Sequence, residues 1–326
     1  MKAIHTSPPG GWDQTRLVET DEPMPQSGEA LVEIHATGLN PADRFLIEGS
    51  YPGGPKPPFV AGRDAAGVVL RDDSGRWKSG DRVVVLQAST TNLADGTLAQ
   101  RQRIQSDLLA PLPDKWSFTE GATALTYLTA WQALMHVRPI SQGEVVLITG
   151  ASGGVGTAAV QLAVGLGAKV VALSRSESKR QRLLGNGAHF ALDPQREDLK
   201  KEVFRDVERQ GVDLVVENVG GDSLATAVHL LGKGGAVAVV GLLAGVEGRI
   251  SIPSLLFKRA RVEGVLVTDD SVRHAQSNWE QIASALDTTG QRPLVDRTFP
   301  LGEYQSAFEH LSASPFGKVI VLPQEG

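Results

Sequence analysis

The pattern of hydrophobic and polar residues divides the chain into a region of short strands and a region where strands and helices alternate. Up to about residue 116, short apolar runs at 30–34, 67–70 and 81–86 are separated by clusters of Pro and Gly. This pattern is typical of β-strands joined by turns. From Ser117 the apolar residues take helical spacing, which continues to Met135. We therefore place a domain boundary near residue 118.

The second region repeats a strand followed by a helix. Apolar runs lie at 145–149, 169–174, 189–192, 212–219, 235–241 and 261–267, with helical patterns at 154–166, 177–184 and 195–210 between them. The last three runs are nearly all apolar, as expected for parallel strands covered on both faces. The predicted fold class is α/β, with a doubly wound parallel sheet of six strands.

The chain after Val267 is too short to form a domain of its own. It shows helical patterns at 271–286 and 303–311 and strand patterns at 297–301 and 318–322. We expect this tail to complete the N-terminal β domain. The predicted division is therefore residues 1–118 with 268–326 as one domain, and residues 119–267 inserted between them as a Rossmann domain.

The amino-acid composition limits the kinds of molecule that the protein is expected to bind. The chain has 32 Lys and Arg against 37 Asp and Glu, a net charge of −5, which predicts a small-molecule partner and neither nucleic acid nor a membrane. It has no cysteine, so disulfides and cysteine-ligated zinc are excluded. The N-terminus does not resemble a secretory signal, and the longest apolar stretch, 236–246, is too short to span a bilayer. We expect a cytoplasmic protein.

A glycine-rich turn follows the first strand of the second region. The sequence Gly-Ala-Ser-Gly-Gly-Val-Gly at 150–156 leads directly into a helix of small residues. Such a turn lets the backbone approach a pyrophosphate, whose charge then lies at the helix N-terminus. Ala151 replaces the first glycine of the dinucleotide fingerprint. We predict that a dinucleotide binds at Ala151, Ser152, Gly153, Gly154, Val155 and Gly156.

Two other interpretations of this turn stay open. It could be a purely structural turn, and residues 150–154 also match the G-x-S-x-G elbow of serine hydrolases, with Ser152 as the nucleophile. In the hydrolase fold several βα units precede the elbow, whereas a turn-rich region precedes it here. The seven histidines include no obvious downstream partner for Ser152. The dinucleotide interpretation is therefore preferred.

The end of the second strand of this region predicts which dinucleotide binds. NAD-specific sites hold an acidic residue there for the ribose 2′-hydroxyl, but this chain has Ser174 and Arg175. Lys179 and Arg180 add positive charge where a 2′-phosphate would lie. NADPH is therefore the predicted cofactor, and the alternative is that these charges are a solvated helix face.

Six motifs give the chain a resemblance to a known family. They are GLNPAD at 38–43, GRDAAG at 62–67, DGTLAQ at 95–100, GASGGVGTAAVQLA at 150–163, VGG at 219–221 and FGKV at 316–319. With them the sequence resembles the zinc-free quinone oxidoreductase branch of the medium-chain dehydrogenase/reductase superfamily. The resemblance implies a Rossmann domain inserted into a mostly-β, GroES-like catalytic domain. It also implies a homodimer formed through the strand near residues 261–267.

The resemblance also implies the chemistry. Zinc-dependent relatives hold their metal with a Cys and a His, and this chain has Asn40 and Arg63 near those places. Without a metal to hold an alkoxide, the expected reaction is hydride transfer from the nicotinamide to a quinone or an enone. The alternative is a non-catalytic NADPH-binding sensor or structural protein of the same fold.

Candidate site residues follow from the same resemblance. Asn40 and Asp43 are expected near the nicotinamide, and Tyr51 is a candidate proton donor. A turn-capping role for Asn40 and a packing role for Tyr51 stay open. The resemblance further implies cofactor contacts from Thr129, Asn218, Gly241, Leu242, Leu243, Val267, Thr268 and Lys318.

Overall fold

The computed structural model describes residues 1–7, 11, 14–51, 54–86, 96–269 and 271–325. The chain forms two compact units. Unit 1 comprises Met1–Leu125, Thr268–Glu280 and Arg292–Gly326, and unit 2 comprises Thr126–Val267 and Gln281–Gln291. Two helices contribute residues to both units, α3 (Ala124–Met135) and α9 (Val272–Thr289).

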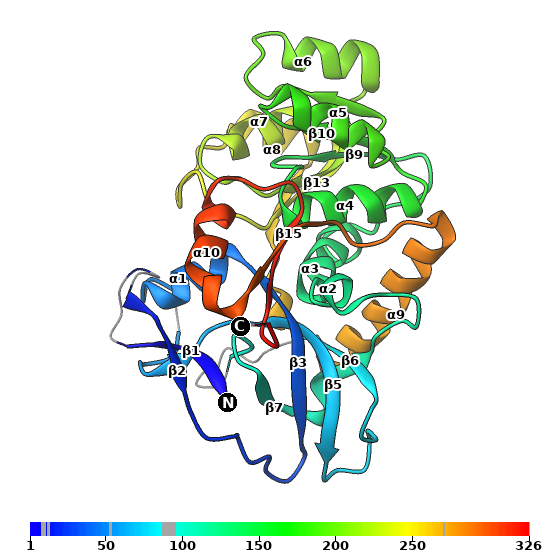
Figure 1. Cartoon of the computed structure of the whole chain (residues 1–326). Coiled ribbons are helices and arrows are strands. Elements are labelled where there is room, and N and C mark those ends of the chain that lie inside the picture. Colours follow the sequence, from blue (N-terminus) through cyan, green and yellow to red (C-terminus); the bar gives the residue numbers. More distant parts are fainter. Residues whose placement is uncertain (8–10, 12–13, 52–53, 87–95, 270, 326) are drawn as a thin grey trace. The chain divides into compact units, whose positions relative to one another are not determined.

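Unit 1 is built mainly from β-strands (Figure 1). Its described residues form one three-stranded sheet, in the order β2–β1–β4, and one seven-stranded sheet, in the order β15–β16–β3–β5–β6–β8 with β7 paired to β3. The strands are β1 (Lys2–Thr6), β2 (Arg16–Glu19), β3 (Glu29–Leu39), β4 (Phe59–Val60), β5 (Asp64–Asp72), β6 (Arg82–Val85), β7 (Arg101–Gln105), β8 (Leu109–Pro111), β15 (Val295–Pro300) and β16 (Lys318–Leu322). The helices are α1 (Pro41–Ile47), α2 (Phe118–Gly121) and α10 (Tyr304–Ser312).

The C-terminal strand lies inside the large sheet of unit 1. Strand β16 pairs parallel with β15 on one side and antiparallel with β3 on the other, where Val319 faces Leu39. Lys318, the first residue of β16, therefore lies beside the end of β3. That strand leads through Asn40 into α1.

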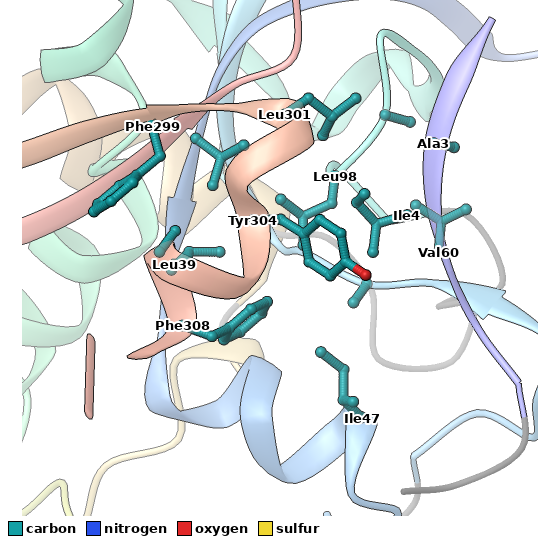
Figure 2. Packing of buried hydrophobic residues seen from close by; sticks show 14 of the residues in the cluster. Ala3, Ile4, Leu39, Ile47, Val60, Leu98, Phe299, Leu301, Tyr304 and Phe308 are labelled. Atoms are coloured by element: carbon teal, nitrogen blue, oxygen red, sulfur yellow. The ribbon is translucent and has the colours of Figure 1, made fainter. Parts of the chain in front are cut away.

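A hydrophobic cluster packs α1 and α10 against the strands of unit 1. Figure 2 shows the buried side chains of Leu39, Ile47 and Phe308 in this cluster, with Tyr304 among them. The Tyr304 hydroxyl donates a hydrogen bond to the Thr15 carbonyl at 2.7 Å, which satisfies its polar end. This packing fixes helix α1, which carries the predicted catalytic residue Asp43 and begins directly after another, Asn40.

Unit 2 contains the predicted doubly wound parallel sheet. Its described strands pair in parallel in the order β11–β10–β9–β12–β13–β14. The strands are β9 (Val145–Ile148), β10 (Lys169–Leu173), β11 (Phe190–Leu192), β12 (Val212–Glu217), β13 (Leu231–Val239) and β14 (Arg261–Gly264). The connecting helices are α4 (Gly154–Gly165), α5 (Glu177–Gly185), α6 (Leu199–Glu202), α7 (Ser223–Leu230) and α8 (Ile252–Lys258). The order reverses between β9 and β12, and this switch point is where such sheets bind ligands.

Three predictions from periodicity were wrong in detail. The helix predicted at 195–210 begins only at Leu199 and ends in a π-helical turn at Val203–Val207. The helical segment from Ser117 to Met135 is split into α2 and α3. Strand β14 is not covered on both faces, because its four residues are all exposed at the edge of the sheet. An apolar run alone cannot distinguish a central strand from an edge strand.

None of the helices in the described residues has both the length and the hydropathy that crossing a bilayer requires.

Candidate functional site

The glycine turn of unit 2 is packed to backbone contact. A Cβ atom at Gly156 would lie 2.4 Å from the Gly150 carbonyl oxygen, so only glycine fits there. Gly150 has a φ of +54°, in the left-handed region. The Ala151 N–H donates to the Leu173 carbonyl at 3.1 Å, which ties the turn to the end of β10. The turn therefore holds the N-terminus of α4 in one position.

Helix α4 begins at this turn, and the residue that caps its N-terminus is a glycine. Gly153 is the N-cap and has φ −79° and ψ 178°, and a Cβ there would meet only the Gly150 carbonyl oxygen, at 3.6 Å. The predicted cofactor residues Ser152, Gly153 and Val155 are all partly exposed. Partly exposed N–H groups at a helix N-terminus are a site for an anion.

Ser152 lies in this turn as a half-buried residue. Within the described part of the chain, no histidine forms a hydrogen bond with it. The structure gives no support to the serine hydrolase interpretation, which needs a base within hydrogen-bond reach of the nucleophile.

The end of β10 presents a hydroxyl and positive charge. Ser174 is 7% exposed, and Arg175 is exposed. Arg180 donates through Nη1 to the Ser174 carbonyl at 2.8 Å and the Arg175 carbonyl at 3.0 Å, and it pairs with Asp193 at 3.4 Å. Arg180 therefore stabilises the turn, and Arg175 and Lys179 add positive charge to the same segment.

Asn218 lies beside the glycine turn, across the switch point of the sheet. Its backbone N–H donates to Thr149 Oγ1 and its Nδ2 to the Thr149 carbonyl, both at 2.9 Å. Its Oδ1 is buried and has no hydrogen-bond partner among the described residues. The structure thus brings together the turn after β9 and the residue after β12.

The buried carboxylate of Glu217 fixes the backbone that follows β12. It accepts hydrogen bonds from the Val219 N–H at 2.8 Å, the Gly220 N–H at 3.0 Å and the Ser223 hydroxyl at 2.9 Å. Glu217 and Gly220 line a pocket of about 430 Å³, whose other lining includes Gly241, Leu242 and Leu266. Sequence reasoning missed Glu217 and Thr149 because Glu217 ends a strand and Thr149 directly follows one, and both runs look purely structural.

The other predicted cofactor residues of unit 2 lie on loops and a helix. Leu242 and Leu243 are 49% and 63% exposed, far more than is usual for leucine. Val267 is buried, and its carbonyl accepts from Gln132 Nε2 at 3.4 Å. Thr129 is half-buried on α3.

A second polar cluster lies in unit 1, where β3, α1, β5 and β16 meet. Lys318 is 3% exposed, and its Nζ pairs with Asp64 Oδ2 at 2.9 Å and donates to Asn40 Oδ1 at 2.7 Å. Asp64 Oδ1 accepts from the Leu125 N–H at 3.1 Å. Lys318 thus lies in a buried ion pair, on a strand that has neighbours on both sides in the sheet.

Asn40 and Asp43 form the start of helix α1. Asn40 is extended, with φ −123° and ψ 151°, and is the N-cap before Pro41. Asp43 Oδ2 accepts the Asn40 N–H at 2.7 Å, while its Oδ1 is buried without a partner among the described residues. Burial raises the pKa of Asp43, although nearby Arg63, the Asn40 N–H and Lys318 act in the opposite direction.

Tyr51 faces the guanidinium of Arg63. Arg63 Nη1 donates to the Tyr51 hydroxyl at 3.5 Å, and its Cζ lies 5.5 Å from the centre of the Tyr51 ring. Sequence reasoning quoted Arg63 and Asp64 within a motif but did not assign them to the site. A charged pair inside an otherwise apolar run, next to a glycine, was the signal for both.

The residues of unit 1 do not fit a zinc ion. The chain has no cysteine. The described residues contain no group of three or more His, Asp or Glu side chains arranged to hold a metal. The buried carboxylates Asp43 and Asp64 are accompanied by the cations Arg63 and Lys318, which would repel a metal. The chemistry proposed for this chain uses no metal ion.

Comparisons with known proteins agree with this architecture. Residues 26–138 match the family model "Alcohol dehydrogenase GroES-like domain", and residues 154–288 match "Zinc-binding dehydrogenase". The chain is 30% identical to the quinone oxidoreductase of Sus scrofa, over 99% of this chain and 98% of that protein. It also matches the crystal structure of Escherichia coli quinone oxidoreductase complexed with NADPH, with a TM-score of 0.89, 27% identity, and coverage of 99% and 100%.

A parallel Rossmann-type sheet, a GroES-like β unit and a glycine turn at the switch point define a dinucleotide-dependent oxidoreductase. The chain belongs to the quinone oxidoreductase branch of the medium-chain dehydrogenase/reductase superfamily.

Proposed function

We propose that the protein is an NADPH-dependent reductase of quinones or activated alkenes. The observation that carries this proposal is the glycine turn at the switch point, packed so closely that no side chain fits at Gly156. The similar E. coli protein was crystallised with NADPH, and the curated relatives are named quinone oxidoreductases. The bound cofactor would supply a hydride from C4 of its nicotinamide.

The residues of unit 2 would bind and orient this cofactor. The N–H groups after Gly153 would hold the pyrophosphate, together with the other residues of the turn, Ala151 to Gly156. Ser174, Arg175 and Lys179 would bind the 2′-phosphate. We place the nicotinamide half against Asn218, whose unpartnered Oδ1 is an acceptor. The remaining proposed contacts are Thr129, Gly241, Leu242, Leu243 and Val267 of unit 2 and Thr268 of unit 1.

The polar cluster of unit 1 would act on the substrate. Lys318 fixes the amide of Asn40, which we propose contacts the substrate carbonyl or the cofactor ribose. Asp43, which is fully buried, would act by holding the backbone of Asn40. Tyr51 would donate the proton that balances the hydride.

Cofactor binding is tested first and turnover second. The purified protein is titrated with NADPH and NADH by calorimetry, and a panel of quinones and enones is then added while absorbance at about 340 nm is followed. We expect tighter NADPH binding and loss of absorbance that depends on the acceptor. Binding without turnover by either class would favour the non-catalytic alternative, and no binding would refute our interpretation of the turn.

The substitution Ser174→Asp tests the preference for NADPH over NADH. A carboxylate there would repel the 2′-phosphate and could accept from a ribose hydroxyl. We expect NADPH affinity to fall at least tenfold, about 1.4 kcal/mol, while NADH affinity stays equal or rises. Equal loss for both cofactors would show that Ser174 does not distinguish them.

We also infer a homodimer formed through the edge strand β14. Its residues are all exposed, and exposed apolar side chains on neighbouring α8 include Ile252, Leu256 and Phe257. An unpaired edge beside an apolar surface favours pairing with another strand. If two copies pair antiparallel about Val262, Arg261 of each copy faces Glu263 of the other, so the edge is complementary to itself.

Charge reversal tests this pairing. Arg261→Glu and Glu263→Arg should each shift the protein toward the 34.6 kDa monomer in sedimentation, and the double variant should restore the dimer. A wild-type protein that sediments as a monomer at every concentration would refute the dimer.

A further inference from the structure

Arg63 is a buried cation whose charge is not matched by an adjacent carboxylate. It is 5% exposed, and within the described residues no carboxylate oxygen lies within 4.0 Å of its guanidinium. Its Nε is buried and has no hydrogen-bond partner in that part of the chain. A buried, unpaired charge is costly, so its position calls for a function. The nearby Lys318, by contrast, is paired with Asp64 at 2.9 Å.

The backbone around Arg63 is fixed. Gly62 has a φ of +101°, and a Cβ there would lie 2.7 Å from Thr97 Oγ1. Hydrogen bonds from the Thr97 N–H to the Gly62 carbonyl and from the Leu98 N–H to the Ala61 carbonyl hold the two residues directly before Arg63. The direction of the Arg63 side chain is therefore set by the fold.

Tyr51 is held in an equally defined place. Its backbone N–H donates to the Phe45 carbonyl at 3.1 Å, and its own carbonyl accepts from the Gly54 N–H at 3.0 Å. Its side chain packs against the hydrophobic cluster shown in Figure 2. Two anchored segments thus bring the Tyr51 hydroxyl and the Arg63 guanidinium together.

We propose that Arg63 is the positioning residue that makes Tyr51 a proton donor, an inference that rests on the function proposed above. Because Arg63 Nη1 donates to the Tyr51 oxygen, the phenolic hydrogen must point away from Arg63 and is available to another acceptor. The guanidinium then faces the negative charge that remains on Tyr51 after the proton leaves. The 3.5 Å contact is long, as such contacts often are before substrate binds.

The charges nearby support this role. The pKa of Asp43, a carboxyl group close enough to interact with the Arg63 charge, is raised, and burial is the largest cause. Asp64 is already paired with Lys318. Neither carboxylate therefore neutralises Arg63 fully, and a phenolate at Tyr51 would be the counter-charge that the guanidinium lacks.

The step balances for a quinone. The hydride brings two electrons to the quinone and leaves a hydroquinone monoanion. The O–H bond of Tyr51 then breaks, a new O–H bond forms on the hydroquinone oxygen, and the electron pair stays on the Tyr51 oxygen beside Arg63. Water returns the proton to Tyr51 before the next turnover.

The test uses quinones that differ in the basicity of their monoanions. For electron-rich quinones, whose monoanions need the proton, Tyr51→Phe should lower kcat about 100-fold and Arg63→Met about tenfold. Both losses should shrink toward none for electron-poor quinones. The double variant should be no worse than Tyr51→Phe, because both residues act on one proton. Arg63→Lys, which keeps the charge, should recover part of the loss.

The controls separate this role from folding and from the proposed function. Each variant is checked by thermal unfolding, and Arg71→Met, at an exposed arginine paired with Asp73, is the matched control. A loss in Arg63→Met that is the same for every quinone, or that multiplies with Tyr51→Phe, would overturn the inference while leaving the reductase function intact. A wild-type protein that reduces neither quinones nor enones would overturn both.

Discussion

Two glycines of the dinucleotide turn offer a matched pair of perturbations. A Cβ at Gly156 would lie 2.4 Å from the Gly150 carbonyl oxygen and 2.6 Å from Ala151 Cα, both backbone atoms. Cβ contacts under 3.0 Å are essentially never found, so the turn must move by at least about 0.6 Å to accept Gly156→Ala. Overpacking of this kind costs about 1–3 kcal/mol.

Gly153→Ala is the control for folding. The nearest atom to a Cβ there is the Gly150 carbonyl oxygen at 3.6 Å, and the backbone has φ −79°, which alanine adopts without strain. Because alanine is a poorer N-cap than glycine, we expect a small cost of about 0.5 kcal/mol. The added methyl group would nevertheless stand where the pyrophosphate must approach the backbone.

The assay measures stability and binding on the same samples. Urea unfolding should show a clear loss for Gly156→Ala and little change for Gly153→Ala. Calorimetric titration with NADPH should show at least a tenfold loss of affinity for both variants, about 1.4 kcal/mol or more. If Gly153→Ala is as stable as the wild type and binds NADPH equally well, the pyrophosphate does not lie at this turn, and our reasoning about the site fails.

Three further outcomes are expected elsewhere in the molecule. Lys318→Met removes the cation that pairs with buried Asp64 and should lower the free energy of unfolding by about 3–5 kcal/mol. The double variant, Lys318→Met with Asp64→Asn, should lose less stability. Equal losses for the two variants in urea unfolding would refute the argument that the two residues stabilise the fold as a pair. Gly38→Ala places a Cβ 2.0 Å from the Ala122 carbonyl oxygen and should lower the yield of folded protein, with a cost of about 3 kcal/mol or more, measured by thermal unfolding. Partial desolvation acts to raise the pKa of Asp72, but hydrogen bonds from Ser106, Trp77 and Ser74 outweigh it and lower the pKa to about 2. The stability that this depressed pKa contributes is present above pH about 4 and lost toward pH 2, so the urea midpoints of wild type and Asp72→Asn should converge as pH falls through that range.

Local patterns predicted most of unit 2 from the sequence. Alternating strands and helices with a glycine turn after the first strand were enough to predict the parallel sheet, which the structure confirms. The exposure of β14 was missed because the predicted apolar run covers 261–267, whereas the strand itself is Arg261–Gly264, whose charged Arg261 and Glu263 are typical of an edge strand. Edge position is a property of the whole sheet.

The candidate site of unit 1 was less accessible to sequence reasoning. Asn40, Asp43 and Tyr51 could be proposed because they lie in or near recognisable motifs. The pairing of Lys318 with Asp64 joins segments that are distant in sequence and meet only in the folded unit, and the contact between Arg63 and Tyr51, 12 positions apart, depends on how the chain between them folds back. No periodicity carries that information.

The hydrogen bond between Lys318 and Asn40 joins residues 278 positions apart, and this has a consequence during synthesis. At about 5–20 residues per second, Asn40 and its neighbours wait roughly 15–60 s for Lys318 to be made. Residues 126–267 of unit 2 are contiguous and can fold in that interval. Unit 1 cannot finish folding in that interval, because Asp64 pairs with Lys318 only after strand β16 has inserted between β3 and β15. A nascent chain that stops before Lys318 would therefore contain the contiguous residues 126–267 of unit 2, while its unit 1 would lack strand β16 and the cation that pairs with Asp64.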